Sequence, residues 1–88
     1  MITKLRQKIN KIDKDLLSLI KARIETVLKI KKEKNRNKIF VTDILREKEL
    51  KNRWEKTAAQ KKLKVSFVNK VFDLMIKESK RIQNESDN

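Results

Sequence analysis

The stretch ITKLRQKINKIDKDLLSLIKARIETVLKIKKEKN (residues 2–35) decides the fold. Its apolar residues recur alternately three and four positions apart, which is the spacing of one face of an α-helix. This first seam comprises Ile2, Leu5, Ile9, Ile12, Leu16 and Leu19. A second apolar stripe joins it in the middle of the stretch, at Leu17, Ile20, Ile24 and Leu28. The pattern predicts one long helix over residues 2–35, covered from several sides between residues 16 and 30.

A helix of this length is too long for one small chain to cover. Roughly 34 residues at about 1.5 Å each span about 50 Å. A compact chain of 88 residues has a radius of gyration near ~12 Å and is about 30 Å across. We therefore expect a homodimer in which the long helices of two chains pair. The alternative is a purely structural protein that forms an extended coiled-coil rod.

The rest of the chain predicts two shorter helices. The periodicity is lost over residues 35–38, and residues 39–41 form a short apolar connector. Thr42 or Asp43 offers an N-cap for a helix over residues 43–61, and a further helix is expected over residues 65–83. The break at residues 61–64 rests on the apolar pattern alone, and the polar tail at residues 84–88 is expected to be frayed.

The composition is typical of an all-α chain with a single domain, residues 1–88. The 88 residues include no Gly or Pro, and most of them are good helix formers. Because Cys and His are also absent, we exclude disulfides, zinc and haem sites and nucleophiles that depend on His. We find neither a membrane-spanning run nor a signal-peptide core. The expectation is a cytoplasmic protein with no metal, no cofactor and no membrane partner.

The chain is strongly basic, with a net charge of +13 from 25 Lys and Arg against 12 Asp and Glu. Residues 1–38 hold 13 of the basic residues and 4 of the acidic ones. Such a charge attracts polyanions and small dianions alike, so a nucleic-acid-binding protein is one alternative. However, the lysines are spread around the long helix, and the four aromatic residues form no stacking pattern. We therefore expect no nucleic-acid partner.

Four polar residues interrupt the apolar stripes from within: Arg23, Glu47, Ser79 and Gln83. A buried charge needs a partner, because leaving it unpaired costs several kcal/mol. In one interpretation Arg23 and Glu47 pair across a helix interface, while Ser79 and Gln83 face solvent. In the other, which we favour because all four occur together, they line a polar pocket inside a helical bundle.

Helical phase links Lys34, but not Arg6, to Arg23. Lys34 follows Arg23 by 11 residues, so the two side chains leave nearly the same face about 16 Å apart. Arg6 precedes Arg23 by 17 residues and points about 100° away. The two arginines of one chain therefore cannot line one pocket, whereas in a dimer Arg6 can complete the pocket of the other chain.

The chain resembles the all-helical (type II) chorismate mutases along essentially its whole length. The resemblance is carried by LRQKINKIDKDLLSLIKAR at residues 5–23, Lys34, DILREKEL at residues 43–50 and FVNKVFDLMIKESKRIQ at residues 67–83. The family's pattern has an early Arg, a second Arg, a Lys, an Asp-x-x-Arg-Glu motif, and a late Ser with Gln four residues on. All of these positions occur here with the family's spacing and without insertions.

The resemblance implies an intertwined homodimer of three-helix chains with two active sites, each using one arginine from the other chain. It also implies that the enzyme rearranges chorismate to prephenate, a Claisen rearrangement that needs no cofactor. Arg23 and the partner's Arg6 would hold the two carboxylates of the substrate, and Ser79 would assist at one of them.

The remaining roles also follow from the resemblance. Lys34 and Gln83 would donate hydrogen bonds to the ether oxygen whose C–O bond breaks. Glu47, with the backbone near Asp43, would bind the ring hydroxyl. Arg46 would support the acidic residues Asp43 and Glu47, and it would contact a carboxylate of the substrate through water.

Two questions stay open at the level of the sequence. Lys80 follows Ser79 at a position where the family more often has an apolar or small residue, so it either crowds the pocket mouth or extends into solvent. An isochorismate-pyruvate lyase of the same fold is the nearest alternative activity. The pair Arg46-Glu47 favours the mutase, because a carboxylate suits a ring hydroxyl.

Overall fold

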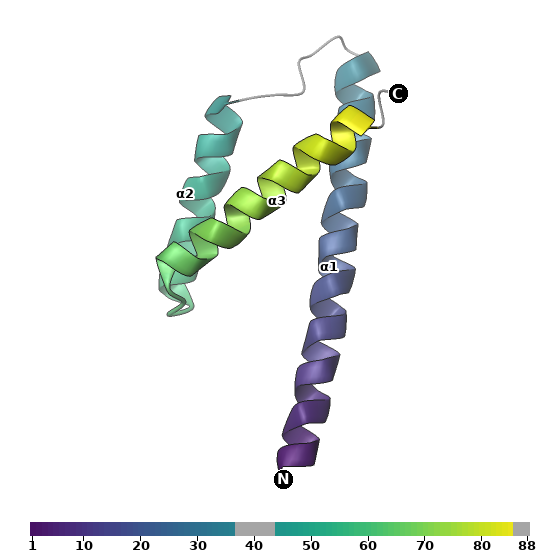
Figure 1. The fold of residues 1–88 in the computed structure, drawn as a ribbon. Helices are drawn as coiled ribbons and strands as arrows, with labels where there is room; N and C mark the ends of the chain where they lie inside the picture. Colours follow the sequence, from purple (N-terminus) through teal and green to yellow (C-terminus); the bar gives the residue numbers. More distant parts are fainter. Residues whose placement is uncertain (37–43, 86–88) are drawn as a thin grey trace.

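The computed structural model of the chain describes residues 1–36 and 44–85 and comprises three α-helices (Figure 1). They are α1 (Ile2–Arg36), α2 (Ile44–Gln60) and α3 (Val65–Glu85), with no strand among the described residues. The all-α prediction with one long and two shorter helices is confirmed, and each helix end lies within two residues of its expected position. The connector expected at residues 39–41 and the N-cap expected at Thr42 or Asp43 lie outside the described residues.

The first half of α1 projects away from the other two helices (Figure 1). Every residue from 1 to 19 is exposed, including the whole of the first apolar seam. The molecule is 55 Å long, and its radius of gyration of 16.0 Å exceeds the ~12 Å of a compact chain of this size. Neither α1 nor any other described helix combines the length and apolar character that a membrane span needs.

The helices α2 and α3 form an antiparallel hairpin with a small apolar core (Figure 1). Ala58 and Phe72 are 1% and 4% exposed, and the ring of Trp54 meets that of Phe72 edge-on at a centroid distance of 5.2 Å. Such an aromatic pair contributes about 0.5–1.5 kcal/mol beyond its buried area. Trp54 and Ala58 are four positions apart on one face of α2, and this is therefore the face that α2 packs against α3.

The helix α3 packs against both other helices, whereas α1 and α2 make no close backbone contact within the described residues. On α1 the partly buried apolar residues begin at Ile20 and continue with Ile24, Val27 and Leu28, so the second apolar stripe is the one that meets α3. Leu16, Leu17 and Leu19 remain exposed, and a single chain covers the middle of α1 on one side only.

The break between α2 and α3 is made by a lysine in a left-handed conformation. Lys62 has φ of 59°, its amide donates to the carbonyl of Ala59 at 3.2 Å, and the amide of Leu63 donates to Ala58 at 2.8 Å. These two bonds form a Schellman motif, which satisfies carbonyls that the helix end would leave without donors. Leu63 and Ala58 also line one apolar cavity, the contact that usually accompanies this motif.

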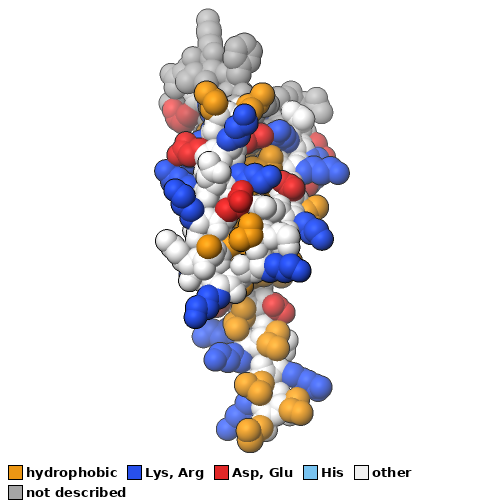
Figure 2. Space-filling view, turned by 90° about the vertical axis from the view of Figure 1, so that its left-hand side faces the viewer, with side chains coloured by type: hydrophobic (Ala, Val, Ile, Leu, Met, Phe, Trp, Pro, Cys, Tyr) orange, Lys and Arg blue, Asp and Glu red, His pale blue; other side chains and the backbone are white. Residues whose placement is uncertain are grey.

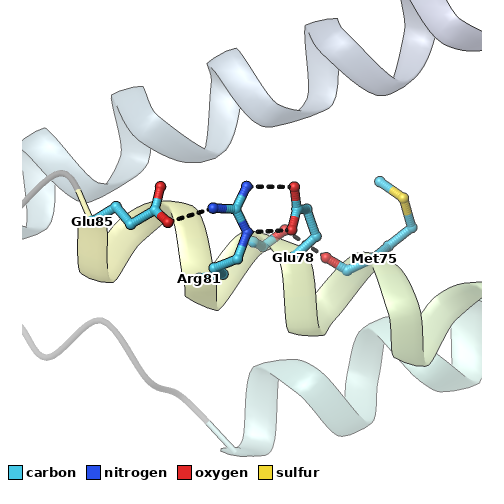
Figure 3. A network of polar contacts seen from close by, with 5 residues as sticks. Met75, Glu78, Arg81 and Glu85 are labelled. Carbon is cyan, nitrogen blue, oxygen red and sulfur yellow. Dashed lines mark hydrogen bonds and ion pairs between the residues drawn. The ribbon is translucent and has the colours of Figure 1, made fainter.

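The last turns of α3 are held by exposed ion pairs (Figure 3). Arg81 binds both carboxylate oxygens of Glu78, at 2.7 and 2.8 Å, and reaches Glu85 at 2.5 Å. The hydrogen bonds from Arg81 hold the pKa of Glu78 below its usual value. The helix continues through Asn84 and Glu85, two residues beyond the end expected from the sequence.

Replacing Lys62 by Gly is expected to stabilise the chain. A residue other than Gly pays about 1 kcal/mol for the left-handed conformation, so Lys62→Gly should raise the free energy of unfolding by about that amount. Urea denaturation at fixed protein concentration measures it. The matched control is Lys61→Gly, which removes the same charge at a residue with negative φ. If both variants changed stability equally, the assignment of strain to Lys62 would be wrong.

Candidate active site

A cavity of about 630 Å³ lies among the second half of α1, the start of α2 and the end of α3. This is where α1 and α2 face each other without backbone contact, with α3 packed against both. Apolar side chains form part of its wall, at Ala22, Val27, Ile30, Leu50 and Ile76. Its polar lining consists of Arg23, Thr26, Lys31, Lys34, Arg46, Glu47, Ser79, Lys80 and Gln83. A volume of this size suits a small-molecule ligand.

Arg23 is anchored to α3 through Ser79. Its Nη1 donates to Ser79 Oγ at 3.1 Å, and Ser79 Oγ donates to the carbonyl of Met75 at 2.8 Å. Ser79 is 7% exposed, and partial burial lowers the pKa of the Arg23 guanidinium from its ordinary value. The interpretation that Arg23 pairs with Glu47, and that Ser79 faces solvent, is therefore wrong. The guanidinium is held by a neutral hydroxyl, which leaves its charge uncompensated by this contact.

Lys31 on α1 is hydrogen-bonded to the last turns of α3, at Gln83. It is 4% exposed, and its Nζ donates a hydrogen bond to the main-chain carbonyl of Gln83. That carbonyl lies near the C-terminal end of α3, where helical carbonyls lack intrahelical donors and a positive charge is favourable. The side-chain Oε1 of Gln83 is buried at the same place. Lys31 therefore ties α1 to the residue that the sequence singled out at the end of α3.

Glu47 is paired with Lys80 rather than with an arginine. Lys80 Nζ lies 2.9 Å from Glu47 Oε1, and both residues line the cavity. The pair joins α2 to α3 at a partly exposed position, since the side chains of Lys80 and Glu47 are 46% and 30% exposed. Lys80 thus lines the cavity with its side chain about half exposed, rather than only extending into solvent.

Lys34 and Arg46 lie at the α1 and α2 sides of the cavity. Lys34 is partly buried, whereas Arg46 is exposed and forms an ion pair with Glu49 at 3.1 Å. An exposed pair of this kind contributes at most about 1 kcal/mol to stability.

Of the eight residues predicted for the site, six line this cavity, one lies elsewhere on α1 and one is outside the described residues. Arg6 is exposed on the projecting half of α1, about 25 Å along the helix axis from Arg23. Asp43 lies outside the described residues. The structure brings together the other six: Arg23, Lys34, Arg46, Glu47, Ser79 and Gln83.

Lys31 and Thr26 line the cavity, although the sequence pattern did not single them out. For Lys31 a signal exists, because the second apolar stripe runs through Ile24 and Leu28 and reaches residue 31 three positions later. For Thr26 there is no comparable signal, and its hydroxyl donates to the carbonyl of Ala22 at 2.8 Å within α1.

The cavity is lined by five basic residues and one acidic residue among those described. It therefore favours an anionic small molecule, and Glu47 adds one place that accepts a hydrogen bond from the ligand. Within residues 1–36 and 44–85, no cluster of three or more acidic side chains could hold a metal ion.

The sequence of the chain is similar to those of known proteins. A family model described as "Chorismate mutase type II" matches residues 5–84. The chain is 34% identical over 74 residues to the bifunctional chorismate mutase/prephenate dehydratase of Buchnera aphidicola subsp. Schizaphis graminum (strain Sg). This match covers 84% of the chain and 19% of the relative, so the chain spans about a fifth of that protein's length. No solved structure matches significantly.

The matched residues 5–84 include every residue of the cavity lining and the early Arg6. By the extent of that match, the chain belongs to the type II chorismate mutase family.

Proposed function

We propose that this chain catalyses the rearrangement of chorismate to prephenate. The observation that carries the proposal is the cavity itself, which gathers cations from three helices and one carboxylate within a chain of this family. A pericyclic rearrangement needs no nucleophile, and none of the lining residues is required to act as one. What it needs is a substrate held in a compact conformation and donors aimed where negative charge develops.

In the proposal Arg23 holds one carboxylate of the substrate. The support is its fixed position, since Ser79 orients the guanidinium at 3.1 Å without neutralising it. A planar guanidinium presents a fork of donors that matches a carboxylate. Ser79 then assists at the same carboxylate, and the second carboxylate is assigned to Arg6 of the other chain.

Lys34 and Gln83 are assigned to the ether oxygen whose bond to carbon breaks. Negative charge grows on this oxygen in the transition state, so donors placed there stabilise the transition state more than the bound substrate. Both residues line the cavity, and Lys31 restrains Gln83 through its main-chain carbonyl. The ring hydroxyl is assigned to Glu47 and to the backbone near Asp43. Arg46 is assigned a water-mediated contact with a carboxylate of the substrate.

We further propose that the chain works as an intertwined homodimer and as one domain over residues 1–88. The support is the uncovered first half of α1, where the first seam and Leu17 are each more than half exposed. Figure 2 shows hydrophobic side chains gathered on this projecting part. An apolar surface of this extent on a water-facing helix is typical of an interface.

Another cavity, which is apolar and has a volume of about 380 Å³, opens on the hairpin beside Trp54, Leu63 and Phe67. Leu63 and Phe67 are each at least half exposed there. It offers a surface on which the projecting half of the other chain's α1 can pack. A cytoplasmic location remains a prediction.

Incubation of the purified protein with chorismate tests the proposed reaction directly. Prephenate is the expected product, and a parallel incubation with isochorismate should release no pyruvate. Pyruvate release without prephenate would instead assign the lyase activity to the same cavity.

Gln83→Glu should shift the activity towards acid pH. A carboxyl group donates a hydrogen bond to the ether oxygen only when it is protonated. Activity should therefore be present below the pKa of the introduced carboxyl and be lost as the pH rises through it. The measurement is kcat/KM against pH, with Gln60→Glu, at an exposed residue outside the cavity, as the control. A profile identical to that of the wild type would remove Gln83 from this role.

Mixing two inactive variants should restore activity if the site is shared between chains. In a dimer of an Arg6→Ala chain and an Arg23→Ala chain, one site regains both arginines and the other loses both. Equal mixing with full subunit exchange should restore about a quarter of the wild-type activity, because about half of the dimers are mixed and each has one of two sites. Either variant exchanged with itself should stay inactive. No recovery despite proven exchange would contradict the shared site.

A further inference from the structure

Among the described residues that line the cavity, Lys80 is the one cation to which the proposed function assigns no part. It stands on α3 directly after Ser79, and its Nζ lies 2.9 Å from Glu47 Oε1 on α2. Glu47 is the one acidic residue among the described residues that line the cavity. Lys80 is therefore paired with Glu47, the residue to which the proposed function assigns the ring hydroxyl of the ligand.

A long acidic side chain in this cavity has several competing partners. Arg23, Lys31, Lys34 and Arg46 line the same space, and an unrestrained Glu47 could neutralise one of them. A carboxylate that moved onto Arg23 would compete with the carboxylate of the ligand for the same donors. An acid that is to bind a hydroxyl must therefore be held away from the cations that bind the anionic groups.

The contact with Lys80 meets this requirement. It engages Oε1 of Glu47 and leaves Oε2 to accept a hydrogen bond, because an ionised carboxylate has two acceptor oxygens. The pair is partly exposed, so its contribution to folding is small. The pair therefore matters more for the position of the Glu47 carboxylate beside the ligand than for the stability of the fold.

We propose that Lys80 is a positioning residue that holds Glu47 in place to recognise a hydroxyl group on the ligand, and so determines specificity for hydroxylated ring dicarboxylates. The inference rests on the proposed function, in which the ligand carries a ring hydroxyl beside two carboxylates. Lys80 acts through Glu47 and does not contact the ligand.

The test uses two non-reacting ring dicarboxylates that differ only in carrying a hydroxyl or a hydrogen on the ring. Calorimetric titration of each into the full chain gives the ratio of the two dissociation constants. The wild type should prefer the hydroxylated ligand about tenfold, and Lys80→Met should reduce that preference to within about twofold. Lys77→Met, which removes the same charge from an exposed site on α3 outside the cavity, should retain it.

A double-mutant cycle separates positioning from direct binding. In a Glu47→Gln background, Lys80→Met should leave the ratio unchanged, because the carboxylate through which Lys80 acts has been removed. If Lys80→Met weakens both ligands equally and keeps the preference, Lys80 binds the ligand or only stabilises the fold, and the inference is overturned. Thermal unfolding of each variant shows whether a loss of ligand affinity results from a loss of folding stability.

The same proteins distinguish this inference from the proposed reaction. Failure of the wild type to convert chorismate to prephenate would overturn the proposed reaction. The ratio of the dissociation constants of the two ring dicarboxylates would still decide the role of Lys80. Conversion by the wild type with an undiminished preference in Lys80→Met would overturn the role of Lys80 alone.

Discussion

The length of α1 is the constraint on which the rest of this structure depends. The helix spans 35 residues, or about 52 Å, and the hairpin of α2 and α3 is long enough to contact only part of it. The hairpin meets α1 at its second half, where the second apolar stripe is partly buried. One end of α1 therefore contributes to a cavity, and the other end presents an uncovered apolar seam.

The cavity exists because α3 packs against both other helices while α1 and α2 remain apart. Polar contacts between described residues join α1 to α3 beside this space, among them Arg23 to Ser79 and Lys31 to the carbonyl of Gln83. Another, between Glu47 and Lys80, joins α2 to α3. Each of these contacts uses α3, so this helix has a central part in the polar lining, although the apolar pattern of the sequence is strongest in α1.

Much of the arrangement could be predicted from periodicity and phase. The apolar spacing predicts the helices, and polar residues within the stripes point to Arg23, Glu47, Ser79 and Gln83. The partners of these residues could not be predicted, because the choice between Ser79 and Glu47 for Arg23 depends on how α3 crosses α1. The positive φ at Lys62 was equally hidden, since a lysine carries no local signal for a left-handed residue.

The contacts that close the cavity are also far apart along the chain, which has a consequence for the order of folding. Arg23 and Ser79 are 56 residues apart, and Lys31 and Gln83 are 52 apart. The hairpin of α2 and α3, by contrast, is closed by a short turn at Lys62. Because closing a long loop costs more entropy than closing a short one, the hairpin can form before α1 docks. The cavity is then among the last features to assemble and the first to open, so a bound ligand protects the end of α3 from local opening more than it protects the hairpin core.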